Sequence, residues 1–172
     1  MPEDPELDQA LADWGVLRHL VLALDDDITA DVGDVGVPGQ SFGVLHLLLH
    51  APQRQMPMTE LARRMFMTAG GFTKLADRLG QAGLIDRRGA AADRRVVFAT
   101  LTKEGITAAR QAERRYRDAI STRLLGTIDA GRLAAAVEAL RPLLATAPAL
   151  PADFGQRVEA RDPALPERRR GR

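Results

Sequence analysis

The chain contains no cysteine among its 172 residues. It can therefore form no disulfide, hold no thiolate-ligated zinc and use no thiol-based redox switch. Long apolar runs are also lacking, because stretches such as VLAL and VLHLLL fall far short of the about 20 residues that a membrane span needs. The first residues are acidic and spaced by proline, unlike the cationic start of a signal peptide. We expect a soluble, cytoplasmic protein.

Catalytic motifs are lacking as well. The sequence contains no glycine-rich loop that would cradle a phosphate, no nucleophile motif and no pair of carboxylates beside a base. We therefore expect neither an enzyme nor a bound cofactor. Lysine is scarce, with only Lys74 and Lys103 among the 24 basic residues, so the abundance of arginine by itself says little about a partner.

The charge is distributed unevenly along the chain, although the net charge is only +1. Residues 1–50 hold one arginine against ten acidic residues, whereas residues 59–104 hold nine basic residues against five acidic ones. Residues 105–128 add five basic residues against two acidic ones. A basic middle between acidic and mixed ends is typical of a protein that contacts a polyanion.

The first half of the sequence has the apolar periodicity of helices. Apolar residues at spacings of three and four predict an amphipathic helix from Leu7 to about Ala30, followed by a glycine-rich loop over 31–39. Ser41 is the expected cap of a second helix through His50, which is apolar on nearly every side and therefore buried. The stretch APQRQMP is expected to be a connection.

The middle of the sequence predicts two consecutive helices and a β-hairpin. Thr59 is the expected cap of a short helix, and Thr68 that of a second helix running to about Gln81. Gly83 is expected to end that helix. The stretches LIDRR and RRVVFATLT flank the small residues GAAAD, a pattern that favours two strands joined by a tight tip.

Two further helices are expected after the hairpin, capped by Thr102 and Asp129. The tail, residues 146–172, is rich in proline and arginine and is expected to be poorly ordered. On the second helix of the middle pair, four apolar residues share one face: Phe72, Leu75, Ala76 and Leu79. The opposite face is polar, which suits a recognition helix in a DNA major groove. The expected fold is mainly α with a small β-hairpin wing, a winged helix-turn-helix.

Residues 58–105, MTELARRMFMTAGGFTKLADRLGQAGLIDRRGAAADRRVVFATLTKEG, resemble the core of the multiple antibiotic resistance regulator (MarR) family of transcription regulators. The pieces TELARRM, DRL, GLIDRR, DRR and LTKEG carry the resemblance. It implies a homodimer that grips a palindromic operator, usually as a repressor, and releases the DNA when a small molecule binds. The rival interpretation is a winged-helix dimer that serves as a protein-interaction module without specific DNA recognition.

The resemblance also implies a division of the chain. Residues 1–40 form an N-terminal dimerisation helix and loop, residues 41–104 the DNA-binding domain, and residues 105–145 the C-terminal dimerisation helices. The residues expected to contact DNA lie on the recognition helix and the wing: Thr68, Gly70, Gly71, Thr73, Lys74, Arg78, Arg87, Arg88, Asp93, Arg94 and Arg95.

Two groups within this set need separate comment. Family members commonly carry Ser or Thr where Gly70 and Gly71 stand, so these glycines either let the helix N-terminus approach DNA closely or are simply tolerated in a first turn. In the family the arginine at the position of Arg95 enters the minor groove, and the aspartate at that of Asp93 braces it. For Arg87 and Arg88, at the base of the wing, we expect phosphate contacts.

The effector site and a possible metal site are less defined by the sequence. Trp14, Arg18, Phe42 and His46 lie on the helices that line the family's ligand cavity, although each could equally be part of a dimer core. His46 and His50 stand four apart on one helix, a spacing that can present two metal ligands. No acidic residue adjoins them in sequence, so a pocket-lining role is favoured and no metal is expected.

Overall fold

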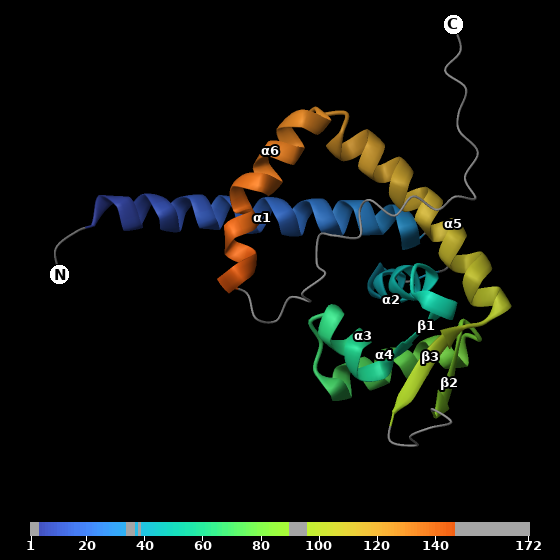
Figure 1. Ribbon diagram of the computed structural model, residues 1–172. Helices are drawn as coiled ribbons and strands as arrows, with labels where there is room; N and C mark the ends of the chain where they lie inside the picture. The colour runs from blue at the N-terminus through green and yellow to red at the C-terminus, as the bar shows by residue number, and fades with distance from the viewer. Residues whose placement is uncertain (1–3, 34–36, 38, 90–95, 147–172) are drawn as a thin grey trace, which may run out of the picture.

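The computed structural model describes residues 4–33, 37, 39–89 and 96–146. Its architecture is mainly helical, with one small antiparallel sheet. Figure 1 shows the helix-turn-helix and the sheet at one end of the molecule, α1 and α6 towards the other, and α5 running between the two ends. The expected fold class is thereby confirmed. None of the described helices is both long enough and apolar enough to cross a membrane.

The first helix, α1 (Pro5–Gly33), is longer than the sequence indicates at both ends. Asp4 precedes it, and its carboxylate accepts hydrogen bonds from the N–H groups of Glu6 and Leu7 (3.2 and 3.3 Å). The helix also continues through Asp31, where a loop was expected. Only Ile28 and Val32, near its C-terminal end, are buried, where α1 packs against α2 and α5.

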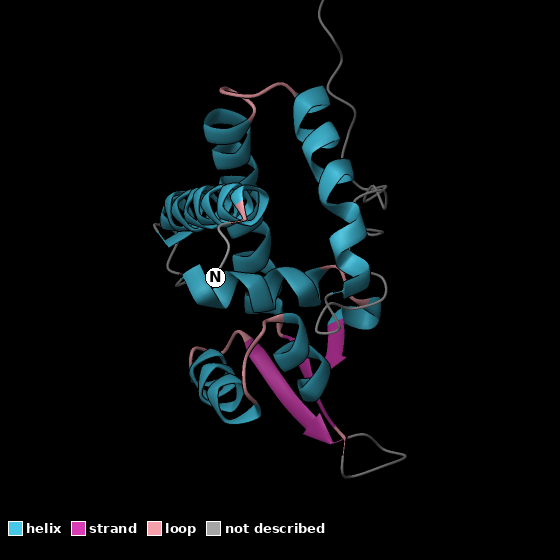
Figure 2. Ribbon diagram, turned by 90° about the vertical axis from the view of Figure 1, so that its left-hand side faces the viewer, coloured by secondary structure: helices cyan, strands magenta, loops and turns pink. Residues whose placement is uncertain are grey.

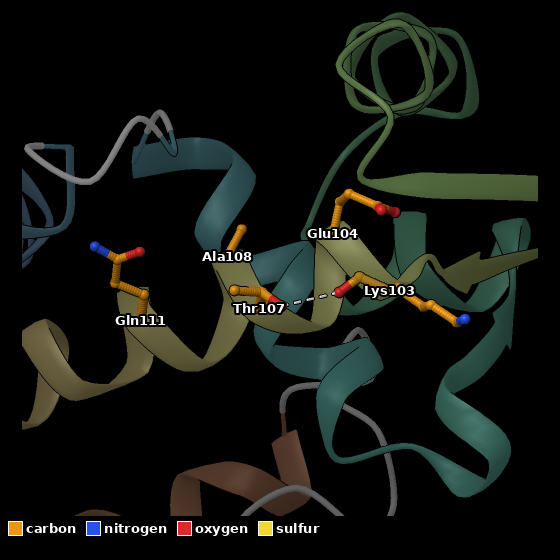
Figure 3. A pocket seen from close by; sticks show the side chains of 5 residues that line it. All are labelled: Lys103, Glu104, Thr107, Ala108 and Gln111. Carbon is orange, nitrogen blue, oxygen red and sulfur yellow. Dashed lines mark hydrogen bonds between the residues drawn. The ribbon is translucent and has the colours of Figure 1, made fainter.

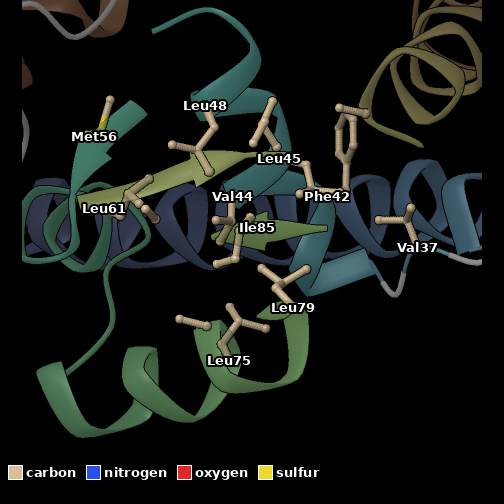
Figure 4. Packing of buried hydrophobic residues seen from close by; sticks show 14 of the residues in the cluster. Val37, Phe42, Val44, Leu45, Leu48, Met56, Leu61, Leu75, Leu79 and Ile85 are labelled. Atoms are coloured by element: carbon tan, nitrogen blue, oxygen red, sulfur yellow. The ribbon is translucent and has the colours of Figure 1, made fainter. Parts of the chain in front are cut away.

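The second helix, α2 (Gly39–Leu49), lies at the centre of the core. Four of its apolar residues, Phe42, Val44, Leu45 and Leu48, are buried and Leu47 and Leu49 are partly buried, which agrees with a helix that is apolar on nearly every side. Figure 4 shows these side chains packed against Leu75 and Leu79 from α4 and Ile85 from the sheet. The helix begins before Ser41, so the prediction that Ser41 caps it is wrong.

The stretch after α2 is more than a connection. A short 3₁₀ turn, η1 (Pro52–Arg54), leads into a strand, β1 (Gln55–Pro57), which pairs antiparallel with β3. The sheet therefore has three strands in the order β1-β3-β2, where the sequence predicted a two-stranded hairpin. Three residues that include a proline give too weak a strand signal to be recognised in isolation.

The helix-turn-helix consists of α3 (Met58–Arg64) and α4 (Ala69–Gln81). Thr59 lies inside the first turn of α3, which is preceded by Pro57 without a side-chain cap, so the cap prediction is wrong there. Thr68 does cap α4, because its Oγ1 accepts a hydrogen bond from the Gly71 N–H (3.2 Å).

Gly83 ends α4 as expected. It adopts φ +69°, a left-handed conformation that costs glycine little. Its N–H donates to the carbonyl of Gly80, and the N–H of Leu84 donates to that of Leu79 (both 2.9 Å). These two bonds satisfy carbonyls that the helix end would otherwise leave unpaired.

The wing strands are β2 (Ile85–Gly89) and β3 (Val97–Leu101), paired from Ile85↔Leu101 to Gly89↔Val97. Figure 2 shows the strands at the lower end of the molecule, with helices above and beside them. The chain then rises through α5 (Lys103–Ala119) and the π-helical turn η2 (Ile120–Leu124) to α6 (Ala130–Leu140) and η3 (Arg141–Thr146). Thr102 and Asp129 cap α5 and α6, as expected. The tail beyond residue 146 lies outside the described residues.

Candidate nucleic-acid interface

The outer face of α4 is the centre of the candidate interface. Its inward face consists of the four residues that the sequence predicted, Phe72, Leu75, Ala76 and Leu79, each at most 2% exposed. The opposite face presents Thr73, Lys74 and Arg78 to solvent. The Thr73 hydroxyl donates to the carbonyl of Ala69 (2.8 Å), so its proton is engaged by its own helix. Among the described residues, the ammonium of Lys74 and the guanidinium of Arg78 on this face have no partner within the chain.

The two glycines in the first turn of α4 have different surroundings. A Cβ atom placed on Gly70 would meet no atom within 4 Å, so packing within the protein does not require glycine there. A Cβ on Gly71 would lie 3.1 Å from Thr68 Oγ1, the atom that caps the helix. A side chain at position 71 would therefore crowd the capping hydroxyl, which explains glycine there by contacts within the chain. Gly70, in contrast, leaves the helix N-terminus open to an approaching ligand.

Arg87 joins the recognition helix to the wing. Its Nη2 lies 2.6 Å from the Asp77 carboxylate on α4, with the two side chains 38% and 42% exposed. Arg88 lies 3.1 Å from Asp86 on its own strand. Both arginines are thus paired with carboxylates within the chain and remain accessible to a phosphate. Sequence analysis did not indicate the contact of Arg87 with Asp77, because it joins two different elements.

The tip of the wing, with Asp93, Arg94 and Arg95, lies outside the described residues. The paired residues Gly89 and Val97 mark the ends of the two strands from which it continues. On α3, Arg63 and Arg64 both bind Glu60, at 2.8 and 2.5 Å. The hydrogen bond from Arg63 is the main cause that holds the pKa of Glu60 below its usual value, which fits an ion-pair network on a partly covered face of α3.

The structure brings together only half of the expected effector site. Phe42 and His46 on α2 meet Tyr116 on α5, with ring centroids 4.9 Å apart for Phe42–Tyr116 and 5.3 Å for Phe42–His46. Trp14 is 59% exposed, and Arg18 is exposed as well; neither belongs to the core cluster. The effector pocket therefore stays a prediction, and in a single chain Trp14 and Arg18 face solvent.

Two open hollows lie elsewhere on the described surface. One, of about 350 Å³, is lined along α5 by Lys103, Glu104, Thr107, Ala108 and Gln111 (Figure 3). The other, of about 400 Å³, lies beside Asp31 and Arg123, which form a bidentate ion pair between α1 and η2 (3.0 and 3.1 Å). Neither hollow includes a residue of the expected effector site. Both hollows are open to solvent and do not resemble an enclosed ligand cavity.

His46 and His50 do have an acidic neighbour, which comes from α5. His50 Nε2 lies 2.7 Å from Glu113 Oε1, and His46 Nδ1 lies 3.8 Å from the same oxygen. Burial, followed by the nearby His50, lowers the pKa of His46. Burial also raises the pKa of Tyr116, which packs against this group. Sequence reasoning missed Glu113 because 63 residues separate it from His50; the spacing of the two histidines was the only available signal.

Comparisons with known proteins agree with this architecture. Residues 35–96 match the family model described as MarR family. The HTH-type transcriptional regulator MhqR of Bacillus subtilis (strain 168) is 30% identical over 91 residues, which are 53% of this chain and 61% of that protein. The match with this curated relative thus spans about three fifths of its length.

Solved structures extend the likeness to the flanking helices. AbsC, a MarR family transcriptional regulator from Streptomyces coelicolor, superimposes with a TM-score of 0.75 at 20% identity, over 81% of this chain and 95% of that one. The transcriptional repressor CouR, bound to a 23-mer DNA duplex, gives a TM-score of 0.64 at 26% identity, over 77% and 89% of the two chains. The fold is thus that of MarR winged helix-turn-helix proteins, and residues 35–96 of the chain resemble the MarR family of transcriptional regulators.

Proposed function

We propose that the protein is a DNA-binding transcription repressor that grips a palindromic operator as a homodimer and responds to a small-molecule effector. The observation that carries the proposal is the exposed outer face of α4, where Lys74 and Arg78 have no partner among the residues that the structure describes and the helix N-terminus is open at Gly70. This face lies beside a basic wing, and the similar structure of CouR is described as bound to duplex DNA. A helix with such a face reads bases in the major groove.

The roles of the individual residues follow from their positions. Lys74 and Arg78 face base edges, while the capped N-terminus at Thr68, Gly70 and Gly71 approaches a phosphate. Thr73, whose proton is held by Ala69, serves as an acceptor. At the wing, Arg87 and Arg88 contact phosphates, Arg95 at the tip enters the minor groove, Asp93 braces it, and Arg94 contributes less.

Dimer formation is supported by apolar side chains that one chain leaves exposed. On α1 these are Leu7, Leu11, Trp14, Val16, Leu20, Val21 and Leu22, and at the C-terminal end they are Val137, Leu140 and Leu143. The helix α6 has no buried residue in the single chain. A helix of this length gains most of its stability from packing, so a second copy is the natural cover for it. The dimer would also bring a partner surface to Trp14 and Arg18.

The test is binding of the full chain to DNA from the region flanking its own gene, compared with random DNA of the same length. We expect preference for the flanking DNA and an affinity that falls steeply between about 50 and 200 mM salt, because each phosphate contact releases counterions. Lys74→Ala should cost about 1–3 kcal/mol and relax preference at one position of each half-site. Arg110→Ala, an exposed arginine on α5, is the matched control.

The outcome decides between this function and its rival. Equal affinity for both DNAs, or no salt dependence, would contradict an operator-binding repressor. It would favour a winged-helix dimer that acts through protein contacts. A loss in Lys74→Ala that is uniform over all sequences would assign Lys74 to a phosphate instead of a base.

A further inference from the structure

Two histidines and a glutamate from distant parts of the chain lie together where α2 meets α5. His46 and His50 stand one helical turn apart, and Glu113 faces them from α5. The three ligand atoms that they offer all lie within 4.8 Å of one another. We propose that His46, His50 and Glu113 form a binding site for a divalent transition-metal ion, with Zn²⁺ as the reference metal.

The donor atoms suit such an ion. Imidazole nitrogens and a carboxylate oxygen are common ligands of Zn²⁺, and a set of three protein ligands leaves one tetrahedral position for water. Zn–N bonds of about 2.0–2.1 Å place tetrahedral ligand atoms roughly 3.4 Å apart. The observed separations from Glu113 Oε1, 2.7 Å to His50 Nε2 and 3.8 Å to His46 Nδ1, lie on either side of that value. Small rotations of the side chains would therefore give the required geometry.

His46 supplies a second, independent observation. Its Nδ1 is shielded from solvent and has no hydrogen-bond partner among the described residues. A buried polar atom without a partner is unfavourable and calls for an explanation such as a bound ion. The His46 ring packs against Phe42 and Tyr116, with centroids 5.3 and 6.3 Å away, and its Nδ1 lies 3.8 Å from Glu113 Oε1.

A plain ion pair between His50 and Glu113 is the simpler interpretation of these contacts. It would tie α2 to α5 through the 2.7 Å contact but would leave His46 Nδ1 without a partner. A metal ion satisfies all three donors at once. The side chains of His46 and His50 are 39% and 40% exposed, so an ion from solvent can reach the cluster. The inference goes beyond the proposed function and does not depend on DNA binding.

The experiment uses the full chain, stripped with a chelator and dialysed. Calorimetric titration with Zn²⁺ should give one ion per chain, and Zn²⁺ should raise the melting temperature, since a ligand that binds only the folded state stabilises it. Co²⁺, added alone as a spectroscopic probe, should give the intense visible bands of a tetrahedral ion, and Zn²⁺ should displace it.

Variants then locate the ion. His50→Gln and Glu113→Gln should each weaken Zn²⁺ binding by roughly tenfold or more and abolish the Co²⁺ bands, because loss of a direct ligand exceeds the effect of an outer-shell change. His19→Gln is the matched control, since His19 is exposed on α1 and its Nδ1 lies 2.7 Å from the carbonyl oxygen of Gly15 in the same helix. Circular dichroism checks that the variants are folded.

Each result supports or overturns the site. Binding of one ion that is lost in both cluster variants and kept in His19→Gln supports it. Binding that is the same in all three variants, or the absence of both 1:1 binding and tetrahedral Co²⁺ bands in the unmodified protein, overturns it. If the cluster variants do not fold, the stoichiometry and Co²⁺ spectrum of the unmodified protein still decide.

Discussion

Packing within the protein does not explain why residue 70 is glycine. A Cβ there would meet nothing within 4 Å, and alanine is favoured over glycine in a helix by roughly 0.5–1 kcal/mol. We predict that Gly70→Ala raises the free energy of unfolding by up to about that amount, measured by urea denaturation. The same substitution should weaken operator binding, because a methyl group would separate the helix N-terminus from DNA. An unchanged affinity would show that glycine is merely tolerated here.

At Gly105, the last residue of LTKEG, packing within the protein does require glycine, unlike at Gly70. A Cβ on this residue would lie 1.9 Å from the carbonyl oxygen of Leu84, which also accepts a hydrogen bond from the Thr102 N–H (3.1 Å). The start of α5 is thus pressed against the end of the helix-turn-helix. We predict that Gly105→Ala destabilises the protein by about 1–3 kcal/mol or more, since the clashing atom belongs to the backbone.

The control for Gly105 is Gly15→Ala in α1, where a Cβ would meet nothing within 4 Å. That substitution should be neutral or stabilising in the same denaturation experiment. Equal effects of the two substitutions would show that the start of α5 can move away from Leu84 at little cost.

At the scale of elements, the contact between Asp77 and Arg87 connects the recognition helix to the wing. Because both side chains are about 40% exposed, their coupling should contribute only about 0.2–1 kcal/mol to stability, measured by a double-mutant cycle. If Arg87 also contacts a phosphate, Arg87→Ala should reduce the slope of affinity against salt by about one. Arg110→Ala should leave that slope unchanged. A slope that Arg87→Ala does not alter would limit Arg87 to an internal role.

At the wing tip, the direction in which Asp93→Ala changes operator affinity distinguishes bracing of Arg95 from simple charge repulsion. Arg95→Ala should weaken operator binding strongly and leave the dimer intact, because an always-charged guanidinium suits a narrow minor groove. Asp93→Ala should also weaken binding if Asp93 braces that arginine, although it removes a negative charge from a DNA-facing element. Arg94→Ala should matter less. Tighter binding by Asp93→Ala, measured by titration of labelled operator, would mean that simple charge repulsion dominates.

The elements differ in how well the sequence predicts them. The buried face of α4 and the caps Thr68, Thr102 and Asp129 follow from local patterns of 3.6-residue period and side-chain chemistry. The strand β1 does not, since its three residues pair only because β3, about forty positions later, offers an edge. Thr59 has the chemistry of a cap, but Pro57 already occupies the position before α3.

The candidate sites divide in the same way. Lys74 and Arg78 are predictable because an exposed position on a helix depends on the spacing of nearby residues alone. The contact of Asp77 with Arg87 depends on how the wing folds back along α4, and that of His50 with Glu113 on how α5 crosses α2. Such pairs combine an ordinary surface charge with a partner from another element, so no local pattern distinguishes them.

At the scale of the whole molecule, acidic and basic residues lie in different parts of the structure. The acidic residues of 1–50 belong mainly to α1, whereas the basic excess lies in the helix-turn-helix, the wing and α5. Figure 1 places α1 at the opposite end from α4 and the sheet. An acidic surface on that side repels DNA, so the charge distribution favours approach from the side of the wing.

The exposed apolar faces of the single chain bear on the oligomeric state of the whole molecule. Because α6 and much of α1 expose apolar side chains, we predict a homodimer at tens of micromolar, with a mass by light scattering about twice the 18.7 kDa of one chain. Charges placed on the apolar face of α6, Val137→Glu with Leu140→Glu, should shift the dimer towards monomer and weaken operator binding, since two half-sites are gripped only by two linked domains. Ala135→Glu, on another face of the same helix, should preserve the dimer. A monomer mass for the unmodified protein would contradict the dimer, and with it the palindromic operator.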